Sequence, residues 1–476
     1  MKLPSVNEQH IQKSFQNIIF QRFYQKMITK FSYFSMISLD LLQHYLTMLG
    51  GNITIPLLFA KPLCIEGDNV GLSEFISTIF FVCGIGTLLQ STVGVRLPII
   101  QGASIAFLAP TVVLMSQPEW KCPYIDAENG KVSFLKFSVL SILDGETCGL
   151  INITDLPPYG SEGHKEIWKA RLCQSPLSFD SRFVDGGSNI PGVNRIQRVT
   201  WVILKYVGPL SIAPTIALIS LPVMGDIADV AANHWYIALT CFVIFIICAM
   251  VFSWVLCYIL TVTNVFPSEK GQWGYPARTD IKLDALDNSQ WFRVPYPGQW
   301  GMPTVSIAGV VGMLSAVLAS MIESVGDYIA CARLSGAPPP PTYAINRGCG
   351  TEGLIVIISG MWGSGPGLTS YSENIGAIAI TKVGSRRVVQ YTSVILLILG
   401  CLGKFGALFV TIPLPVIGGI LLVTLGMVVS VGLSNLQFVN MSSSRNITIL
   451  GTSLFFGLAF PHWIKNHPTA IATVRF

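Results

Sequence analysis

The sequence has few charged residues, and this scarcity indicates the class of protein. Asp, Glu, Lys and Arg make up 12% of the 476 residues, whereas soluble domains carry about 25%. Hydrophobic residues make up 51%, and they form long apolar runs without charges. Helices satisfy their own backbone hydrogen bonds in lipid. The composition therefore predicts an all-α polytopic membrane protein.

The sequence also lacks the motifs of common enzymes and metal sites. There is no P-loop, HExxH or nucleophile-elbow sequence, and none of the 11 cysteines forms a CxxC pair. We therefore expect no catalytic residues, no metal site and no cofactor. The net charge of +5 is small and its basic residues are scattered, so we expect lipid and not nucleic acid as a partner.

No secretory signal is recognisable in the first part of the sequence. Residues 1–31 are polar and mixed in charge, and no short apolar core with a small-residue cleavage site follows them. The first apolar run is therefore predicted to be a spanning helix rather than a removed signal. Residues 1–31 are expected to form a cytoplasmic segment.

Apolar runs predict about eleven membrane-spanning segments. They lie at 32–60, 74–95, 99–116, 199–223, 235–265, 304–334, 350–362, 373–383, 388–411, 414–433 and 446–463. Two of them, 99–116 and 373–383, are too short to cross the bilayer as a full helix of about 20 residues. Both are therefore predicted to be half-helices.

Each of the two short segments follows backbone that Gly or Pro interrupts. The first opens with Pro98 and Gly102, and the second follows the stretch 363–367, which holds three glycines and a proline. One segment lies early in the chain and the other late. Paired interrupted segments of this kind indicate the binding site of an inverted-repeat transporter. The alternative is a pair of buried re-entrant loops without function.

The two faces of the membrane differ in charge and polarity. The loop 117–198 is long and polar and holds the sequon Asn152-Ile153-Thr154, so it is predicted to be extracellular. Basic residues gather on the opposite face, and they are Arg333, Arg347, Lys382, Arg386 and Arg387. Such clustering is typical of the cytoplasmic side.

Two carboxylates in one apolar helix are the strongest sign of a binding site. Glu323 and Asp327 are four residues apart, so they share one helix face. A carboxylate at membrane depth costs about 2.5–3.5 kcal/mol unless it faces a wet cavity or a partner. We expect one to bind a substrate and the other a coupling ion. The alternative is an ion pair with Lys404.

A second candidate region runs from Thr369 to Gly376. Its hydroxyl-rich residues, which include Tyr371 and Ser372, lead into a half-helix that begins near Glu373 and Asn374. A helix N-terminus offers free N–H groups and a positive dipole end. Glu373 can accept hydrogen bonds from the N–H groups of a heterocycle. The alternative role of Glu373 is a simple first-turn helix cap.

Weaker signals come from the early half of the chain. Ser104 and Phe107 lie in the first half-helix, where one can supply a polar contact and the other a stacking ring. Gln43 and His44 lie in the first apolar run. We expect this pair to support a neighbouring broken helix by hydrogen bonds, without contacting the substrate.

These motifs together resemble the nucleobase–ascorbate transporter family. The family signature appears as Glu373-Asn374-Ile375-Gly376 followed by Thr381, and its Glu-Ser-x-Gly-Asp-Tyr motif as Glu323 to Tyr328. The Gln-His pair appears as Gln43-His44. The stretches 40–123, 199–240 and 253–465 all resemble animal members, which include sodium-dependent vitamin C transporters.

The resemblance implies an architecture and roles for the residues. Family members have fourteen spans in two inverted seven-span repeats, a core domain that carries the substrate between two broken helices, and a gate domain where dimers form. Glu323 and Glu373 are then expected to grip the substrate, while Asp327 serves ion coupling. Ser104 and Phe107 are expected to line the pocket, together with Tyr371, Ser372 and Asn374.

Placed on this sequence, the family architecture predicts the domain boundaries. The core domain comprises 32–116 and 304–411, and the gate domain comprises 199–265 and a truncated 412–476. The extracellular loop 117–198 and a polar loop at 266–303 connect them.

The residue before the signature Asn bears on the substrate. Ascorbate carriers of the family usually have Pro there, whereas nucleobase carriers have Glu or Gln, and this chain has Glu373. Ascorbate is an anion that an extra buried carboxylate repels. The resemblance therefore implies a plasma-membrane symporter of a nucleobase such as uracil or xanthine with Na⁺ or H⁺. The alternative is a sodium-dependent ascorbate transporter.

Several predicted spans depart from the family pattern. Residues 174–198 are polar where a span is expected, 235–265 has the appearance of two fused helices, and no span follows 463. A transport-inactive relative that dimerises with full-length members is therefore a further alternative. A channel is disfavoured because no segment supplies repeated polar rings.

Overall fold

The computed structural model describes most of the chain between residues 48 and 467. The described residues are 48–60, 63, 65, 68–115, 124–125, 132–133, 208–243, 246–269, 271–300, 307–381 and 384–467. The predictions for Gln43 and His44, for residues 1–31 and for most of the loop 117–198 lie outside them.

The described part is predominantly helical, as the composition predicts. In chain order the elements are a helix at Met48–Ala60, α2 (Asn69–Thr92), β1 (Gln101–Ala103), η1 (Ile105–Phe107), α3 (Leu108–Met115), β2 (Tyr124–Ile125), β3 (Val132–Ser133), α6 (Pro209–Ser220), η4 (Leu221–Val223), α7 (Met224–Ala232), α8 (Trp235–Val243), α9 (Ile246–Val262), η5 (Tyr275–Ala277), α10 (Leu283–Asn288), α11 (Ile307–Leu334), α12 (Thr342–Trp362), β4 (Leu368–Ser370), α13 (Ser372–Thr381), α14 (Arg386–Gly400), α15 (Gly403–Val410), α16 (Leu414–Ser434), η6 (Asn435–Phe438) and α17 (Ser444–Asn466).

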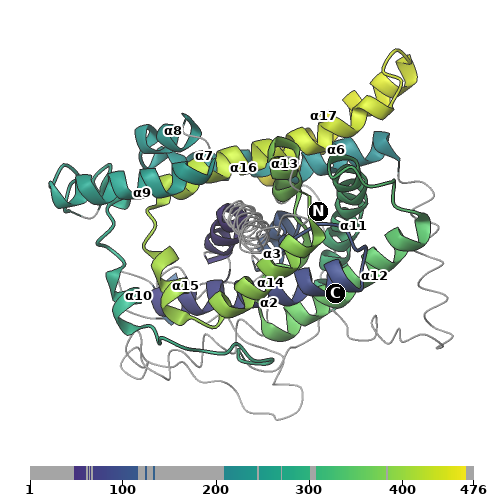
Figure 1. Ribbon diagram of the computed structural model, residues 1–476. Coiled ribbons are helices and arrows are strands. Elements are labelled where there is room, and N and C mark those ends of the chain that lie inside the picture. Colours follow the sequence, from purple (N-terminus) through teal and green to yellow (C-terminus); the bar gives the residue numbers. More distant parts are fainter. Residues whose placement is uncertain are drawn as a thin grey trace, which may run out of the picture.

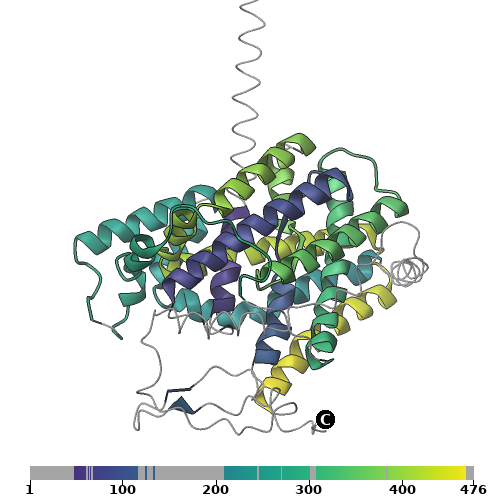
Figure 2. The ribbon, with the colours of Figure 1, turned by 90° about the horizontal axis from the view of Figure 1, so that it is seen from below.

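The helices form two groups with a middle zone between them. Helix α2 packs against α12, α14 and α15, and α16 packs against α6, α7 and α8. Figure 1 shows the first group along the lower side and the second along the upper side, with α3 and α11 between and α13 beside α16. The view from below in Figure 2 brings α2 and its neighbours to the front. Helix α11 contacts α6, and α13 contacts α16, so the groups meet in this zone.

Glycines allow α2 and α14 to approach each other closely. A Cβ atom at Gly84 would lie 2.9 Å from the backbone N of Leu397, and one at Gly400 would lie 2.6 Å from the backbone N of Phe81. Small residues at such crossings are a general device of membrane helices, because close backbones gain van der Waals contact. The first group is therefore tightly packed along α2.

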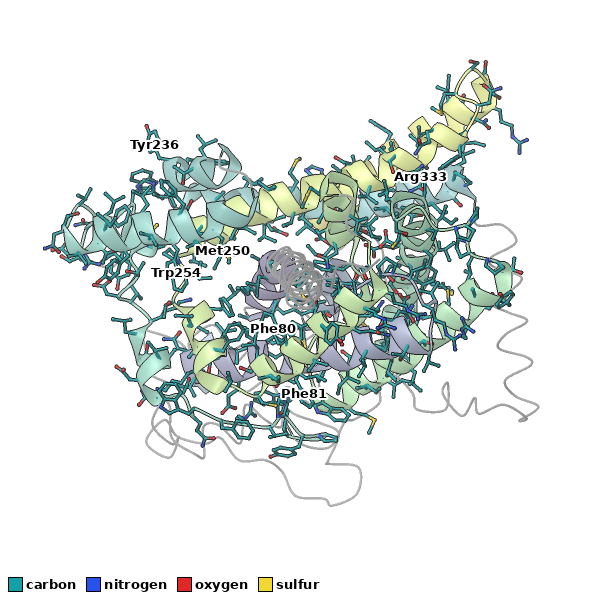
Figure 3. All side chains as sticks on the ribbon, viewed as in Figure 1. Phe80, Phe81, Tyr236, Met250, Trp254 and Arg333 are labelled. Carbon is teal, nitrogen blue, oxygen red and sulfur yellow. The ribbon has the colours of Figure 1, made fainter. Side chains whose placement is uncertain are left out.

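A large apolar cluster joins the two groups. Phe80 of α2 is fully buried and stacks on Phe409, with ring centroids 5.9 Å apart. The same cluster contains Met250 of α9, and Trp254 packs against it. In Figure 3 Met250 and Trp254 lie on the inner side of α9, whereas Tyr236 extends outward. The cluster thus includes residues of both groups.

The number of full-length spans in the described residues is lower than the eleven segments predicted from apolar runs. Five described helices are long and apolar enough to cross a membrane, and a sixth span results if α14 and α15 count as one. These two helices are bent by 87° at residues 401–402, inside the predicted segment 388–411. The predicted segment 235–265 is divided between α8 and α9, each shorter than 18 residues.

Helix α12 also begins earlier than predicted. The apolar run indicates a start at 350, but the helix begins at Thr342. Its first two turns contain Arg347 and other polar residues, so they do not form part of an apolar run. The additional turns extend α12 past the end of α2, where Arg347 Nε donates a hydrogen bond to the backbone oxygen of Gly94 (2.7 Å).

Helix α17 lies at the periphery. It contacts α6 and η4, and none of its apolar 18-residue window is buried. Figure 1 shows it projecting beyond the end of α6. Phe455 and Phe456 are among its exposed large side chains. An apolar helix with so little protein cover is suited to contact with lipid.

Candidate functional site

The two interrupted segments meet at a short antiparallel strand pair. Strand β1 pairs with β4 so that Gln101 lies opposite Ser370 and Ala103 opposite Leu368. Two flanking backbone bonds extend the pairing, from Ser104 N to Gly367 O (3.1 Å) and from Tyr371 N to Ile100 O (3.0 Å). Extended backbone at membrane depth needs such partners, because no water is there to replace them.

A short helix follows each strand, as the interrupted segments predict. β1 leads into η1 and the eight-residue α3, and β4 leads into the ten-residue α13. Ser104 caps η1, since its Oγ accepts a hydrogen bond from Ala106 N (3.2 Å). The N-terminal ends of both helices therefore lie beside the same strand pair, where their free N–H groups are available to a ligand.

Gly102 is needed because the Tyr371 ring occupies the space beside it. A Cβ atom at Gly102 would lie 2.3 Å from the ring, and one at Gly51 would lie 1.3 Å from the hydroxyl oxygen. Tyr371 is only 3% exposed. Its ring thus fills space left by two absent side chains on other segments and fastens β4 to β1 and to the helix Met48–Ala60.

Four buried carboxylates lie around this strand pair. Glu323 and Asp327 come from α11, Glu352 from α12 and Glu373 from the first turn of α13, and their exposed fractions are 6%, 0%, 7% and 5%. Glu323 interacts electrostatically with both Glu373 and Glu352, and Asp327 with Glu323. Like charges buried together are unfavourable unless a cation, a proton or hydrogen-bond donors compensate them. We therefore expect a cation, a proton or hydrogen-bond donors to compensate the charge of these four acids.

Hydroxyl groups from the second interrupted segment donate hydrogen bonds to two of these acids. Ser372 Oγ lies 2.9 Å from each carboxylate oxygen of Asp327. Ser370 Oγ donates to Glu352 Oε1 at 2.6 Å, and Gln101 Nε2 lies 3.4 Å from the same oxygen. The Ser372 contacts join α11 to the start of α13, and the Ser370 and Gln101 contacts join α12 to the strand pair.

Several polar atoms in the site are buried and have no hydrogen-bond partner in the described part of the chain. They are Glu323 Oε2, the Tyr371 hydroxyl oxygen, and both Oδ1 and Nδ2 of Asn374. Buried polar groups are nearly always paired in folded proteins. A group of unpaired donors and acceptors between two half-helices is therefore suited to a polar ligand.

Those predicted site residues that the structure describes lie near one another, with differences in what each contacts. Ser104 lies close to Glu323. Phe107 is 2% exposed and packs against Gly367, where a Cβ atom would lie 2.5 Å from the ring. Its ring thus supports the backbone that precedes β4. Whether Phe107 also lines a pocket remains a prediction.

The alternative of an ion pair between the predicted acids and Lys404 does not fit the structure. Lys404 Nζ donates hydrogen bonds to the backbone oxygens of Leu286 and Asp287 (3.1 Å to the latter) and lies over the ring of Trp291. Two ion pairs within the described ranges join Arg278 to Asp280 and Arg293 to Glu74. Neither of these two pairs includes one of the four carboxylates.

Glu352 is the site residue that sequence reasoning missed. It stands alone between Thr351 and Gly353, with no second acid at helical spacing, and the apolar run 350–362 predicts only a span. The signal available was a carboxylate inside an apolar segment, which by itself marks a functional position in membranes.

Fold and site together define a polytopic membrane protein with a buried polar site between two interrupted helices. The chain belongs to the Permease family, whose sequence model matches residues 37–145 and 240–466. The resemblance drawn from the motifs is thus confirmed.

The chain is similar to several named members of this group. It is 43% identical to Solute carrier family 23 member 2 of Rattus norvegicus over 468 residues, which cover 90% of this chain and 66% of that protein. It is 42% identical to Solute carrier family 23 member 1 of the same species, covering 90% and 72%. Nucleobase-ascorbate transporter 1 of Arabidopsis thaliana is 32% identical, with 89% and 77% covered. The chain therefore spans about two thirds of the length of the first of these relatives.

Proposed function

We propose that the protein is a secondary-active symporter that carries a nucleobase, such as uracil or xanthine, across the plasma membrane together with a cation. The observation that carries this proposal is the group of four buried carboxylates and unpaired polar atoms between the two interrupted helices. Glu323 and Glu373 bind the substrate, and Asp327 couples the cation. No enzymatic step is part of the proposal.

The charge of the site favours a neutral substrate with N–H donors. Glu323 Oε2 is free to accept a hydrogen bond, and Glu373 stands in the first turn of α13. Uracil and xanthine present ring N–H groups to such acceptors and carbonyl oxygens to the Asn374 amide and to backbone N–H groups. An anionic substrate would add a negative charge to four buried acids.

The same charge argues for a coupled cation. Na⁺ or H⁺ bound at Asp327 removes one negative charge from the cluster and so makes substrate binding at Glu323 and Glu373 more favourable. The described residues contain no group of three or more His, Cys, Asp or Glu side chains arranged to hold a metal ion. A sodium ion would therefore need hydroxyl or backbone oxygens beside Asp327, of which Ser372 is the nearest candidate.

The two helix groups supply a route for movement. We assign α2, α11, α12, α13, α14 and α15 to the core domain and α6, α7, α8, α9, α16 and α17 to the gate domain. Their contacts support this division, because α2 packs mainly with α14 and α15 while α16 packs mainly with α6, α7 and α8. Transport then consists of a shift of the core against the gate, and the gate is the expected dimer surface.

Two other functions follow from specific observations. The name of the Arabidopsis relative includes ascorbate as well as nucleobases, so an ascorbate symporter is the second candidate. The predicted segment 235–265 is divided between two helices that are each shorter than 18 residues, so a transport-inactive partner of other family members is the third. Glu373 favours the first function over both alternatives. A further buried carboxylate disfavours an anionic substrate such as ascorbate, and a chain that does not transport has no need of it.

The test is uptake of radiolabelled uracil, xanthine and ascorbate in cells without endogenous uptake, with sodium present or replaced. Cell-surface labelling is measured in parallel. We expect nucleobase uptake that falls at least about ten-fold in Glu373→Gln, because a lost charge-assisted hydrogen bond costs about 1.5–3 kcal/mol. Glu269→Gln is the matched control, since Glu269 is an exposed acid in the connecting loop.

The alternatives predict different results in the same assay. Ascorbate uptake without nucleobase uptake would support the second candidate and refute the assigned role of Glu373. A chain that reaches the surface and carries none of the three compounds would support the third. Sodium replacement separates a sodium-coupled mechanism from a proton-coupled one.

A further inference from the structure

The segment between α9 and α11 carries a group of exposed apolar side chains. The sequence predicts only a polar loop at 266–303, of which the structure describes 266–269 and 271–300. Four large side chains in the stretch 291–296 are more than half exposed, and they are Trp291 (76%), Phe292 (66%), Val294 (51%) and Tyr296 (55%). We call these four residues the exposed patch. A contiguous exposed apolar patch marks a contact with another molecule or with lipid.

The other side of the same stretch is fixed to the protein. Arg293 Nη2 lies 3.2 Å from Glu74 Oε2 of α2, and Arg293 N donates a hydrogen bond to the Cys401 backbone oxygen (2.8 Å). Trp362 Nε1, at the end of α12, donates to the backbone oxygen of Pro295 (3.1 Å), which is buried. From 292 to 296 exposed positions alternate with these attached ones, as in extended backbone. The one charged side chain of the stretch therefore contacts protein, and the apolar ones do not.

The helix ends that hold this stretch lie at one boundary of the membrane. On this side α2 begins, and α12 and α14 end. Arg96, Arg347 and Arg386 lie near the opposite ends of the same three helices. The 21 residues of α12 extend over about 30 Å, which is the thickness of the hydrocarbon core of a bilayer. The stretch 291–296 is therefore expected at the boundary opposite the basic residues, which is the outer one by the positive-inside rule.

Exposed apolar residues on two of these helices lead up to the patch. They are Tyr391, Val394 and Ile398 of α14, which recur at helical spacing, and Leu354 and Met361 of α12. A helix that spans a membrane presents such residues to the lipid chains. The backbone oxygen of Met361 accepts a hydrogen bond from Gly298 N (2.8 Å), and Cys401, which binds Arg293 N, directly follows α14. The patch thus continues two lipid-facing surfaces at their outer ends.

The residue types around the patch change from polar to aromatic along the chain. Helix α10 presents the exposed side chains of Asp284, Asp287 and Asn288, and the patch begins three residues later. Lys404 Nζ lies 5.9 Å from the centre of the Trp291 ring. Trp and Tyr, with an apolar ring and a polar tip, are enriched at the level of the lipid headgroups. In Figure 1 the chain that follows α10 runs along the lower edge of the molecule, on the side away from α16.

We propose that the exposed patch is inserted into the boundary between headgroups and acyl chains of the outer leaflet and anchors this segment to the lipid bilayer. Trp291 and Tyr296 lie at the level of the headgroups, and Phe292 and Val294 contact the acyl chains. Because the same stretch binds α2, α12 and α14, the anchor holds lipid against the outer ends of these helices. The inference goes beyond the proposed transport function and does not depend on the compound that is carried.

Quenching of a fluorescent label on the patch tests the contact with lipid. Val294→Cys is labelled in the purified full chain in phosphatidylcholine vesicles, and the native chain treated in the same way gives the background from its own cysteines. Asn288→Cys is the matched control, since Asn288 is an exposed polar residue of α10. We expect brominated phosphatidylcholine to quench the Val294 label at least about two-fold more than the Asn288 label, and aqueous iodide to quench them in the reverse order.

The other possible surroundings of the patch give different results. Strong quenching by iodide at position 294, without an effect of brominated lipid, would show that the patch lies in water and would overturn the proposal. Weak quenching by both agents would show that protein covers the patch and would overturn it as well. Energy transfer between labelled copies would then identify a second copy of the chain as the cover, and its absence would point to the loop 117–198.

The native tryptophans supply a second measurement that needs no label. Trp291 is exposed, whereas Trp300 of the same segment is buried. We expect Trp291→Phe to lower the share of the intrinsic emission that brominated lipid quenches, and Trp300→Phe to leave that share unchanged. No effect of Trp291→Phe, or an equal effect of both variants, would overturn the proposal. Neither measurement involves uptake, so a failure of the proposed transport function is distinguished from a failure of the lipid anchor.

Discussion

At the scale of single residues, the hydroxyl of Ser372 has a central place in the site. It lies 2.9 Å from both carboxylate oxygens of Asp327, which is fully buried. Ser372 is also the first residue of α13, next to Glu373. One hydroxyl therefore links the proposed cation residue to the helix that carries the proposed substrate residue, and it provides a physical route for coupling between them.

Replacing Ser372 by Ala is expected to weaken cation coupling more than substrate binding. Without the hydroxyl, Asp327 loses a hydrogen-bond donor, a change worth about 1.5–3 kcal/mol for a charged acceptor. We expect the cation concentration for half-maximal uptake to change several-fold and the KM for nucleobase at saturating cation to change little. Ser372→Thr keeps the hydroxyl and should behave as the native chain. An equal loss in both variants, or a change confined to KM, would contradict this role.

The residues of the site differ in how readily the sequence predicts them. The sequence predicts Glu323 and Asp327 as site residues because two acids four residues apart on an apolar helix have no ordinary structural use. Glu352 was missed because its meaning depends on Ser370 and Gln101, which are distant in sequence and reach it only through the β1–β4 pairing. Helical spacing is a local property, whereas this contact is not.

At the scale of elements, the strand pair β1–β4 fixes the relative position of the two half-helices. Tyr371 secures it, because its ring lies over Gly102 and its hydroxyl beside Gly51. The pairing holds only while both positions are glycine. The geometry of the site therefore depends on two residues that carry no functional group.

Gly102→Ala is expected to destabilise the protein by displacing Tyr371. The new Cβ would lie 2.3 Å from the ring, and overpacking of a filled core costs about 1–3 kcal/mol. We expect a lower melting temperature of the purified chain, measured by thermal aggregation. Gly353→Ala is the control, since nothing lies within 4 Å of its Cβ. Combining Gly102→Ala with Tyr371→Ala should cost less than the sum of the single changes, and additive effects would argue against this contact.

Element boundaries were predictable only where apolar runs coincide with helices. The two half-helices were anticipated from their length and their Gly and Pro residues, but the strands before them were not, since three-residue strands leave no alternation to read. The sequence does not predict the bend between α14 and α15, for a related reason. The run 388–411 is continuously apolar apart from a few residues, and the turn at Cys401 and Leu402 depends on the packing of both helices against α2.

At the scale of the whole molecule, the contact between α11 and α6 is the place where the two helix groups meet closely. A Cβ at Gly326 of α11 would lie 2.6 Å from Ile212 Cγ2 and 3.2 Å from Ile216 Cδ1 of α6. Gly326 directly precedes Asp327, so the helix face that touches the proposed gate is one residue away from the proposed cation site. Movement between the groups is therefore expected to change the surroundings of that site.

A disulfide across this contact is expected to stop transport reversibly. Ile212→Cys removes the methyl group that faces Gly326, and Gly326→Cys places a thiol in the vacated space. If the core moves against the gate, oxidation of the double variant should abolish uptake and reductant should restore it, while each single variant is unaffected by oxidation. The matched control is Thr240→Cys with Ser253→Cys, whose hydroxyl oxygens are 3.0 Å apart within the gate group, and its oxidation should leave uptake unchanged. Uptake that continues in a fully cross-linked Ile212–Gly326 pair, verified by mass spectrometry, would mean that α11 and α6 do not separate during transport. The division into two moving bodies would then have to be placed elsewhere in the chain.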